Sequence, residues 1–305
     1  MPNNNDVITP EMLVLIITAT AIGTLARILY IILDYRQYPN YPNGYLIHIV
    51  TGGLAAAFGA FIIPALMTKN FTAVTFLGLA IQQFRDVRKV ERESLLDLEG
   101  EEFAKRGDAY IDGISKIFEA RNYISLLVSF AAALTIQLLQ ELFDVSAWIE
   151  VVSGSLIGLI LFYLLKYLTA RKKVRDIAKV TEGKIEIKGS ELYVDGMFVS
   201  NLMGKGEAKK WFAEEGLAAI IHPNHDHFQI PLLNGGQRQA ILFESARRLG
   251  QKKIYSVQNP TDGKIIIAIV PIINNFDLLK ETILLTPLLE TVKKNPSLLN
   301  KKTGG

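Results

Sequence analysis

The sequence predicts an α-helical multi-pass membrane domain of about four or five spans, followed by a small α+β cytoplasmic domain. Half of the 305 residues are hydrophobic and the mean hydropathy is +0.24, which is high for a soluble protein. Charged residues still make up 21 %, an ordinary share, so apolar and charged residues must occupy different stretches of the chain. We therefore expect a membrane domain over residues 1–170 and a soluble cytoplasmic domain over residues 171–305.

Long apolar runs predict the helices that cross the membrane. A span needs about 20 residues, because a helix rises about 1.5 Å per residue and the hydrocarbon core is about 30 Å thick. The runs of suitable length are Met12–Leu33, Tyr45–Thr68, Asn122–Gln140 and Val151–Leu165. A shorter run, Phe71–Phe84, either crosses the membrane or is re-entrant. The alternatives are therefore five spans with an external amino terminus and four spans with an internal one.

The distribution of Lys and Arg orients these spans, since both residues favour the cytoplasmic side. The last run leads into the basic stretch KYLTARKKVR, whereas the loop ELFDVSAWIE before it contains neither residue. This pattern predicts that the carboxy-terminal domain is cytoplasmic, together with a charged helical segment over residues 85–121. The protein is thus expected in the cell membrane, with the lipid bilayer as a partner. A net charge of only +3 argues against nucleic acid as a further partner.

Two polar residues lie within the first two spans. Arg27 is expected to extend toward the membrane interface or to pair with a polar group inside the helix bundle. His48 is expected to be buried and hydrogen-bonded, and a role in proton or ion movement is the alternative. The second span also contains Gly52, Gly53 and Gly59, which would let a neighbouring helix approach closely.

The segment 85–121 combines charges of both signs with good helix formers, and Gly100 and Gly107 mark the expected breaks. A long helix with a solvated charged surface is the favoured interpretation. The alternative is that an acidic side chain at the membrane face is catalytic, and Asp86 and Asp112 are the candidates for that role.

The stretch DAYIDGISKIFEARNY, which begins at Asp108, has the apolar stripe of a helix that enters the membrane. It also resembles the signature of the YIEGIA family of sporulation proteins, with Asp112 in place of Glu and Ser115 in place of Ala. YRQYPNYPNGY from Tyr35 and QQFRDVRKVERE from Gln82 extend the resemblance. It implies a multi-pass membrane protein of endospore-forming bacteria with a cytoplasmic tail, and it transfers no catalytic residue. The signature residues are Tyr110, Ile111, Asp112, Gly113, Ile114, Ser115, Phe118, Glu119 and Arg121.

The soluble domain is predicted to contain a β-meander and a mixed sheet covered by helices. KIEIK, ELYV and MFVSNL are strand-like and are separated by the turn signals Gly189-Ser190 and Asp195-Gly196. LAAIIH, KKIYSV and the run Lys264–Ile272 predict three further strands. The expected helices are GEAKKWFAEEG, the run from Gly236 to Leu249, and an amphipathic stretch from Asp277 to Lys293.

Two groups of residues in this domain are candidates for chemistry. His222, His225 and His227 are candidate ligands for Zn or another transition metal, although a polar surface loop is the favoured interpretation. Asp195 is a candidate catalytic acid because Asp-Gly is reminiscent of an aspartic-protease turn, but a simple hairpin turn is favoured. The absence of Cys excludes thiolate metal sites and thiol catalysis, and no cofactor is predicted.

These observations lead to one functional expectation and two alternatives. We expect an integral membrane protein that acts in sporulation, whose cytoplasmic domain binds a protein partner. The alternative is a membrane-tethered protease that uses one of the three candidate acids. A transporter is the third interpretation. It ranks last because Arg27 and His48 are few polar groups for a substrate path through the membrane.

Overall fold

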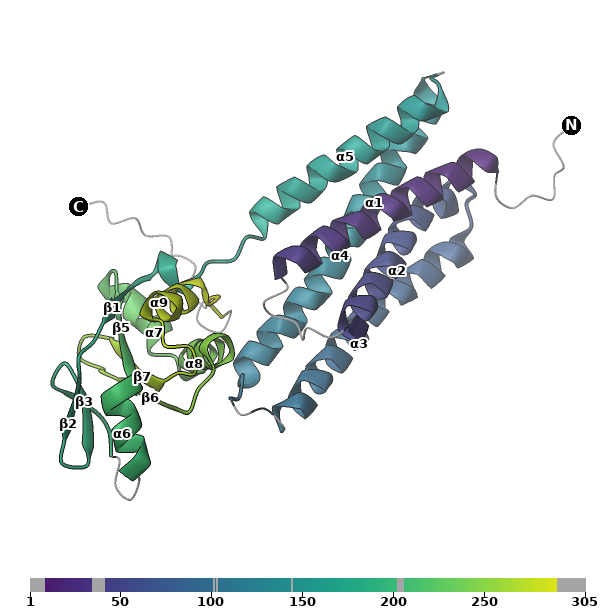
Figure 1. Cartoon of the computed structure of the whole chain (residues 1–305). Coiled ribbons are helices and arrows are strands. Elements are labelled where there is room, and N and C mark those ends of the chain that lie inside the picture. Colours follow the sequence, from purple (N-terminus) through teal and green to yellow (C-terminus); the bar gives the residue numbers. More distant parts are fainter. Residues whose placement is uncertain are drawn as a thin grey trace, which may run out of the picture. The chain divides into compact units, whose positions relative to one another are not determined.

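In a computed structural model, the chain divides into two compact units (Figure 1). The first unit contains Met1–Glu93 and Ile114–Ala170, and the second contains Ser94–Gly113 and Arg171–Gly305. The structure describes residues 9–34, 42–100, 102, 104–143, 145–201 and 206–289. The short segment 94–113, called the connecting segment below, therefore groups with the carboxy-terminal unit although it lies between two long helices.

Five long helices account for the described residues of the amino-terminal part of the chain. They are α1 (Pro10–Asp34), α2 (Pro42–Met67), α3 (Phe71–Glu99), α4 (Asp108–Leu142) and α5 (Ala147–Leu168). Among the described residues, α1, α2, α4 and α5 each contain a stretch long and apolar enough to cross a membrane. These four helices coincide with the four long apolar runs, which confirms the predicted helices and their membrane-like character.

The shorter run Phe71–Phe84 forms the first half of α3, which continues without a break to Glu99. Its second half carries the charges that begin at Arg85, so α3 is not among the helices of membrane-spanning character. The interruption expected near Gly100 and Gly107 is present, because α3 ends at Glu99 and α4 begins at Asp108. A fifth crossing by the start of α3 stays a prediction.

Helix α4 is central to the packing of the first unit. Residues of α4 share buried apolar clusters with α1 and α2, with α1 and α5, and with α2 and α3. Small residues permit this close packing, as a side chain at Gly59 of α2 would collide with the backbone carbonyl of Leu126 in α4. The prediction that a glycine of the second span allows a close helix approach is confirmed at this position.

The described residues of the second unit form two antiparallel sheets, so the predicted mixed sheet is wrong. The four-stranded sheet has the order β1-β5-β7-β6, and the three-stranded sheet is the expected meander β2-β3-β4. Strands β5 and β6 run in the same direction but do not pair with each other. Strand β7 lies between them and pairs antiparallel with both. The strands are β1 (Ala178–Glu182), β2 (Ile185–Lys188), β3 (Glu191–Val194), β4 (Met197–Asn201), β5 (Leu217–Pro223), β6 (Lys253–Gln258) and β7 (Ile265–Val270).

Strand β7 is the centre of the core of the second unit because all six of its residues are buried. One face packs with residues of α8 and α9, and the other packs with α6 and the meander. A strand that is covered on both faces reads as a continuous apolar run, as Ile265–Val270 does. The helices of this unit are α6 (Gly206–Glu215), α7 (Gln229–Leu232), α8 (Gly235–Leu249) and α9 (Phe276–Leu285), with short 3-10 turns η2 (Val174–Asp176) and η3 (Asp226–Phe228).

Candidate functional site: the signature segment

The signature residues all lie on α4, but they belong to different units. Tyr110, Ile111, Asp112 and Gly113 are part of the second unit, whereas the signature residues from Ile114 to Arg121 are part of the first. One continuous helix therefore supplies side chains to both units. We describe the two halves separately.

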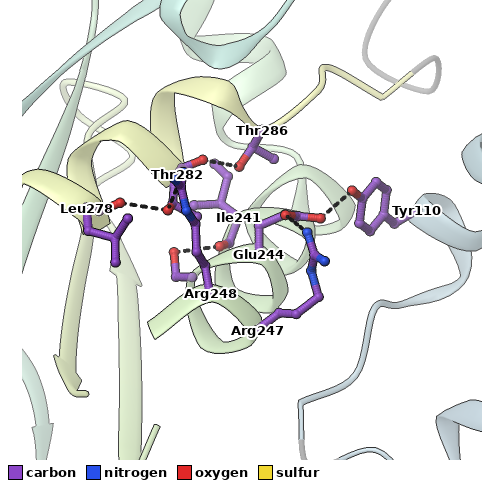
Figure 2. Close-up of polar contacts among 9 residues, drawn as sticks. Tyr110, Ile241, Glu244, Arg247, Arg248, Leu278, Thr282 and Thr286 are labelled. Carbon is purple, nitrogen blue, oxygen red and sulfur yellow. Dashed lines mark hydrogen bonds and ion pairs between the residues drawn. The ribbon is translucent and has the colours of Figure 1, made fainter. Parts of the chain in front are cut away.

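In the second unit, the signature residue Tyr110 is held by a buried polar network (Figure 2). Its hydroxyl donates to Glu244 Oε1 at 2.6 Å, and Arg247 Nη2 donates to Glu244 Oε2 at 2.9 Å. Tyr110 is 2 % exposed and Glu244 is 4 % exposed. The two hydrogen bonds therefore offset the free-energy cost of burying the Glu244 carboxylate. Hydrogen bonds to a charged acceptor are about twice as strong as neutral ones. The bond from Tyr110 to Glu244 therefore stabilises the packing of the start of α4 against α8.

Helix α8, which carries Glu244 and Arg247, is itself fixed against α9. Arg248 of α8 bonds Glu281 at 3.0 Å and Thr282 at 3.4 Å, both on α9. The Thr282 and Thr286 hydroxyls are satisfied by carbonyl groups four residues earlier, as Figure 2 shows. Glu244, the acceptor for Tyr110, thus lies on α8, a helix whose position is fixed by hydrogen bonds to α9.

The rest of the connecting segment contacts the same face of α8. The Arg106 guanidinium lies 4.8 Å from the centre of the Phe243 ring, and it pairs with Glu102 at 2.6 Å. Gln239 Nε2 donates to the Lys105 carbonyl at 2.6 Å. Contacts of several kinds, ionic, cation–π and backbone, therefore build the connecting segment into the α+β unit.

In the first unit, the other half of the signature contacts polar residues of α1 and α2. Phe118 lies 4.9 Å from the Arg27 guanidinium and 4.7 Å from the His48 ring, measured to ring centres. Arg27 contacts His48 Nδ1 at 3.2 Å and donates to its carbonyl at 3.3 Å. Arg121 stacks on the Tyr30 ring at 3.8 Å. The expectation that Arg27 pairs inside the bundle and that His48 is buried and hydrogen-bonded is confirmed.

A glycine makes room for this arrangement. Any side chain at Gly52 would collide with the aliphatic part of Arg27, so the arginine lies directly over the backbone of α2. The signature residues Ile114 and Ser115 are also fully or almost fully buried in this unit, and Glu119 pairs with Arg88 of α3 at 3.5 Å. Residues 35–41, which contain most of the second resembling stretch, lie outside the described residues.

The three candidate acids occupy unrelated places. Asp86 is exposed on α3 in the first unit, and Asp112 is half-buried near the start of α4 in the second. Asp195 lies in the turn between β3 and β4 with a φ of 47°, and its carboxylate accepts from the Lys184 backbone N–H at 2.8 Å. The geometry of Asp195 is that of a residue which fixes a hairpin turn.

The histidines lie at the end of β5 and in η3. His222 Nε2 is 2.8 Å from the Thr181 hydroxyl, while the His225 and His227 rings stack with centres 5.6 Å apart. Burial, and secondarily the nearby Lys264, lowers the pKa of His222 below its ordinary value. In the parts of the chain that the structure describes, no three His, Asp or Glu side chains are grouped closely enough to hold a metal ion.

Sequence reasoning did not find the residues of α8 that receive the signature. Glu244 and Phe243 lie in an amphipathic stretch, where a glutamate is ordinarily solvated. The separation of 134 residues between Tyr110 and Glu244 leaves no local pattern that would connect them. The only available signal is a charged residue, Glu244, on the apolar side of its own helix.

The fold defines a class: apolar helices of membrane-spanning length joined to a small antiparallel α+β unit. Within this class the chain belongs to the YIEGIA family, since a family model described as YIEGIA protein matches residues 15–299. The chain is also similar to a Bacillus subtilis (strain 168) protein described as uncharacterized protein YphB. The two are 34 % identical over 290 residues, which cover 92 % of this chain and 94 % of the relative. No solved structure matches the chain.

Proposed function

We propose that this protein is an integral membrane protein of endospore-forming bacteria that acts in sporulation, and that its α+β unit holds a protein partner at the cytoplasmic face of the membrane. The Tyr110–Glu244–Arg247 network carries this proposal. The network joins the start of α4, which carries the signature, to α8 of the α+β unit. We therefore interpret the signature as the segment that connects the α+β unit to the long helices. An anchoring protein needs such a connection.

The chain passes between the two units three times, at residues 93–94, 113–114 and 170–171. A domain joined by one flexible linker moves independently of its anchor. Two of the three connections here lie within continuous helices, α3 and α4. This architecture favours an adaptor whose bound partner is kept near the bilayer.

Charge distribution supports the cytoplasmic placement of the α+β unit. The stretch KYLTARKKVR lies where α5 ends and the second unit begins, and the loop between α4 and α5 contains no Lys or Arg. The sporulation role is supported by the resemblance of the signature to that of the YIEGIA family of sporulation proteins.

Exposed apolar residues on the α+β unit support a protein partner. Ile272 and Ile273 follow β7 and are 69 % and 51 % exposed. Ile272 also borders a cavity of about 290 Å³ that is lined in part by Phe243 and Arg247. An apolar pair beside a small pocket with a charged rim has the character of a protein-binding surface.

The proposal is tested by proximity labelling from the carboxy terminus of the full chain, produced during sporulation in a Bacillus subtilis strain that lacks its relative. We expect a membrane protein that restores heat-resistant spores and labels one recurring partner. The Ile272→Asp variant should reduce that labelling at least fivefold, whereas Ile230→Asp, a matched control at 63 % exposure, should not. Unaltered spore counts in the deletion strain would contradict the sporulation role, and the absence of a recurring partner would contradict the adaptor role.

A further inference from the structure

Helices α1 and α4 face each other along a line of polar side chains that the proposed function does not use. Asn122, Ser125 and Ser129 of α4 are each 0 % exposed. Among the described residues, both polar atoms of the Asn122 amide and both serine hydroxyls are buried without a hydrogen-bond partner, as is the hydroxyl of Thr20 on α1. We call these four residues the α1–α4 seam.

Contacts on both sides show that the seam lies between the two helices. Its α4 residues follow one another at intervals of three and four, so they occupy one face of α4. A side chain at Gly23 of α1 would meet the Ser125 carbonyl at 2.7 Å and Ser129 Cβ at 2.8 Å. One turn before the seam begins, Phe118 faces Arg27 at 4.9 Å. The seam amide therefore faces the stretch of α1 between Gly23 and Arg27.

Unpaired polar groups are costly in this environment. Inside a bilayer, a buried amide or hydroxyl without a partner costs several kcal/mol. Other hydroxyls in these helices avoid that cost by bonding to a carbonyl of the preceding turn: Thr24 at 2.7 Å, Thr51 at 2.8 Å and Thr135 at 2.8 Å. The seam hydroxyls do not form this bond, so they require a partner other than the described polypeptide.

Water is the ligand whose chemistry fits. The amide and the hydroxyls are neutral groups that both donate and accept, and a buried water typically makes about three hydrogen bonds to such groups. The seam contains no carboxylate, and the charged side chain that lies one turn away, Arg27, would repel a cation. A metal ion is thus a poor match, whereas a water molecule can both donate to and accept from each of these groups.

We propose that the α1–α4 seam binds water molecules, so that the helical unit has a hydrated interior beginning one helical turn from the Arg27–His48 pair. Polar groups at successive turns of α4 give such waters a continuous set of partners. The inference rests on the first unit alone and is independent of the proposed adaptor function.

The chain contains no cysteine, so single cysteines report on the seam without background. Thr20→Cys, Ser125→Cys and Ser129→Cys place a thiol in the seam, in the full chain reconstituted in lipid vesicles. Leu127→Cys is the matched control, since Leu127 lies at the same depth on α4 but is 43 % exposed on its outer face. The probe is methyl methanethiosulfonate, a small neutral reagent that crosses membranes and is attacked by the thiolate.

Hydration decides the rate, because a thiol in hydrocarbon stays protonated and unreactive. We expect the seam cysteines to react at least about tenfold faster than Leu127→Cys. Rates equal to that of the control would mean a dry seam and would overturn the proposal. Each substitution is small, and size-exclusion elution checks folding. A variant that fails this check is replaced by the other two, which test the same seam.

Discussion

Two sets of buried polar groups, one in each unit, differ in their hydrogen-bond partners. In the α+β unit, Glu244 has two donors, and the buried amide of Gln237 bonds both the Pro287 carbonyl and the Leu289 N–H. In the helical unit, the seam residues Asn122 and Ser125 are equally buried but have no partner among the described residues. Pairing of the first kind holds segments of the chain together. The seam groups lack such partners, and the proposed water molecules would supply them. Single polar atoms of the α+β unit, such as His227 Nε2 and Gln251 Oε1, are also buried without a partner among the described residues, but they do not form a continuous line.

Removing the central carboxylate should have the largest effect. Glu244→Ala leaves the Tyr110 hydroxyl buried without its acceptor and removes the partner of Arg247, and we expect a loss of about 3 kcal/mol in the free energy of unfolding. This figure allows for Arg247, whose side chain is 34 % exposed and partly screened by solvent. Thermal or urea unfolding of the full chain in detergent measures the loss.

Tyr110→Phe serves as the companion variant, because it deletes only the donor and keeps the ring. We expect it to lose roughly half as much stability, about 1.5 kcal/mol. Faster proteolysis at the connecting segment should accompany both changes. If Glu244→Ala were as stable as the unmodified chain, the network would not attach this segment.

The packing of the helical unit offers the second test. Gly59→Ala places a methyl group against the Leu126 carbonyl, which belongs to a rigid backbone, so α2 and α4 must separate. We expect a cost of about 2 kcal/mol, as for other overpacked sites. Gly78→Ala is the control, since nothing lies within 4 Å of that position, and it should be neutral or slightly stabilising. Equal melting temperatures for the two variants would refute the close approach.

The smallest expected effect is a pH dependence from His222. Its pKa is lowered in the folded state by burial and by Lys264, so below about pH 6.5 the unfolded chain binds more protons. Stability should therefore fall as the pH drops from about 6.5 toward the folded-state pKa. Melting curves between pH 7.5 and pH 5 should show a shallower decline for His222→Gln. A decline of unchanged slope in that variant would assign the pH dependence to other groups.

Local patterns accounted for much of the fold. The apolar runs predicted α1, α2, α4 and α5 because length and hydropathy are read directly from consecutive residues. The meander followed from its turn signals, and Asp195 and Gly196 do have the positive φ values that such a turn needs. Strand β1 was missed because AKVTE has only a weak alternation, and its place is decided by pairing with β5, forty residues later in the chain.

The candidate site was predictable only in part. The resemblance identified Tyr110, but its acceptor Glu244 could not be found from the sequence, since a contact between distant segments leaves no periodicity. The same holds for Arg106 and Phe243. The sequence also does not single out the seam residues. Only their missing hydrogen bonds in the structure distinguish them from Thr24 or Thr135.

The distance in sequence between Tyr110 and Glu244 also sets an order of events during synthesis. At about 5 to 20 residues per second, the 134 residues between them take roughly 7 to 27 s to translate. At the start of that interval only α1, α2 and α3 have been synthesised in full, and the acceptor for Tyr110 is made only at its end. A tyrosine that is buried in the finished protein therefore lacks its acceptor while the chain grows, and the α+β unit can bury it only after α8 has been synthesised.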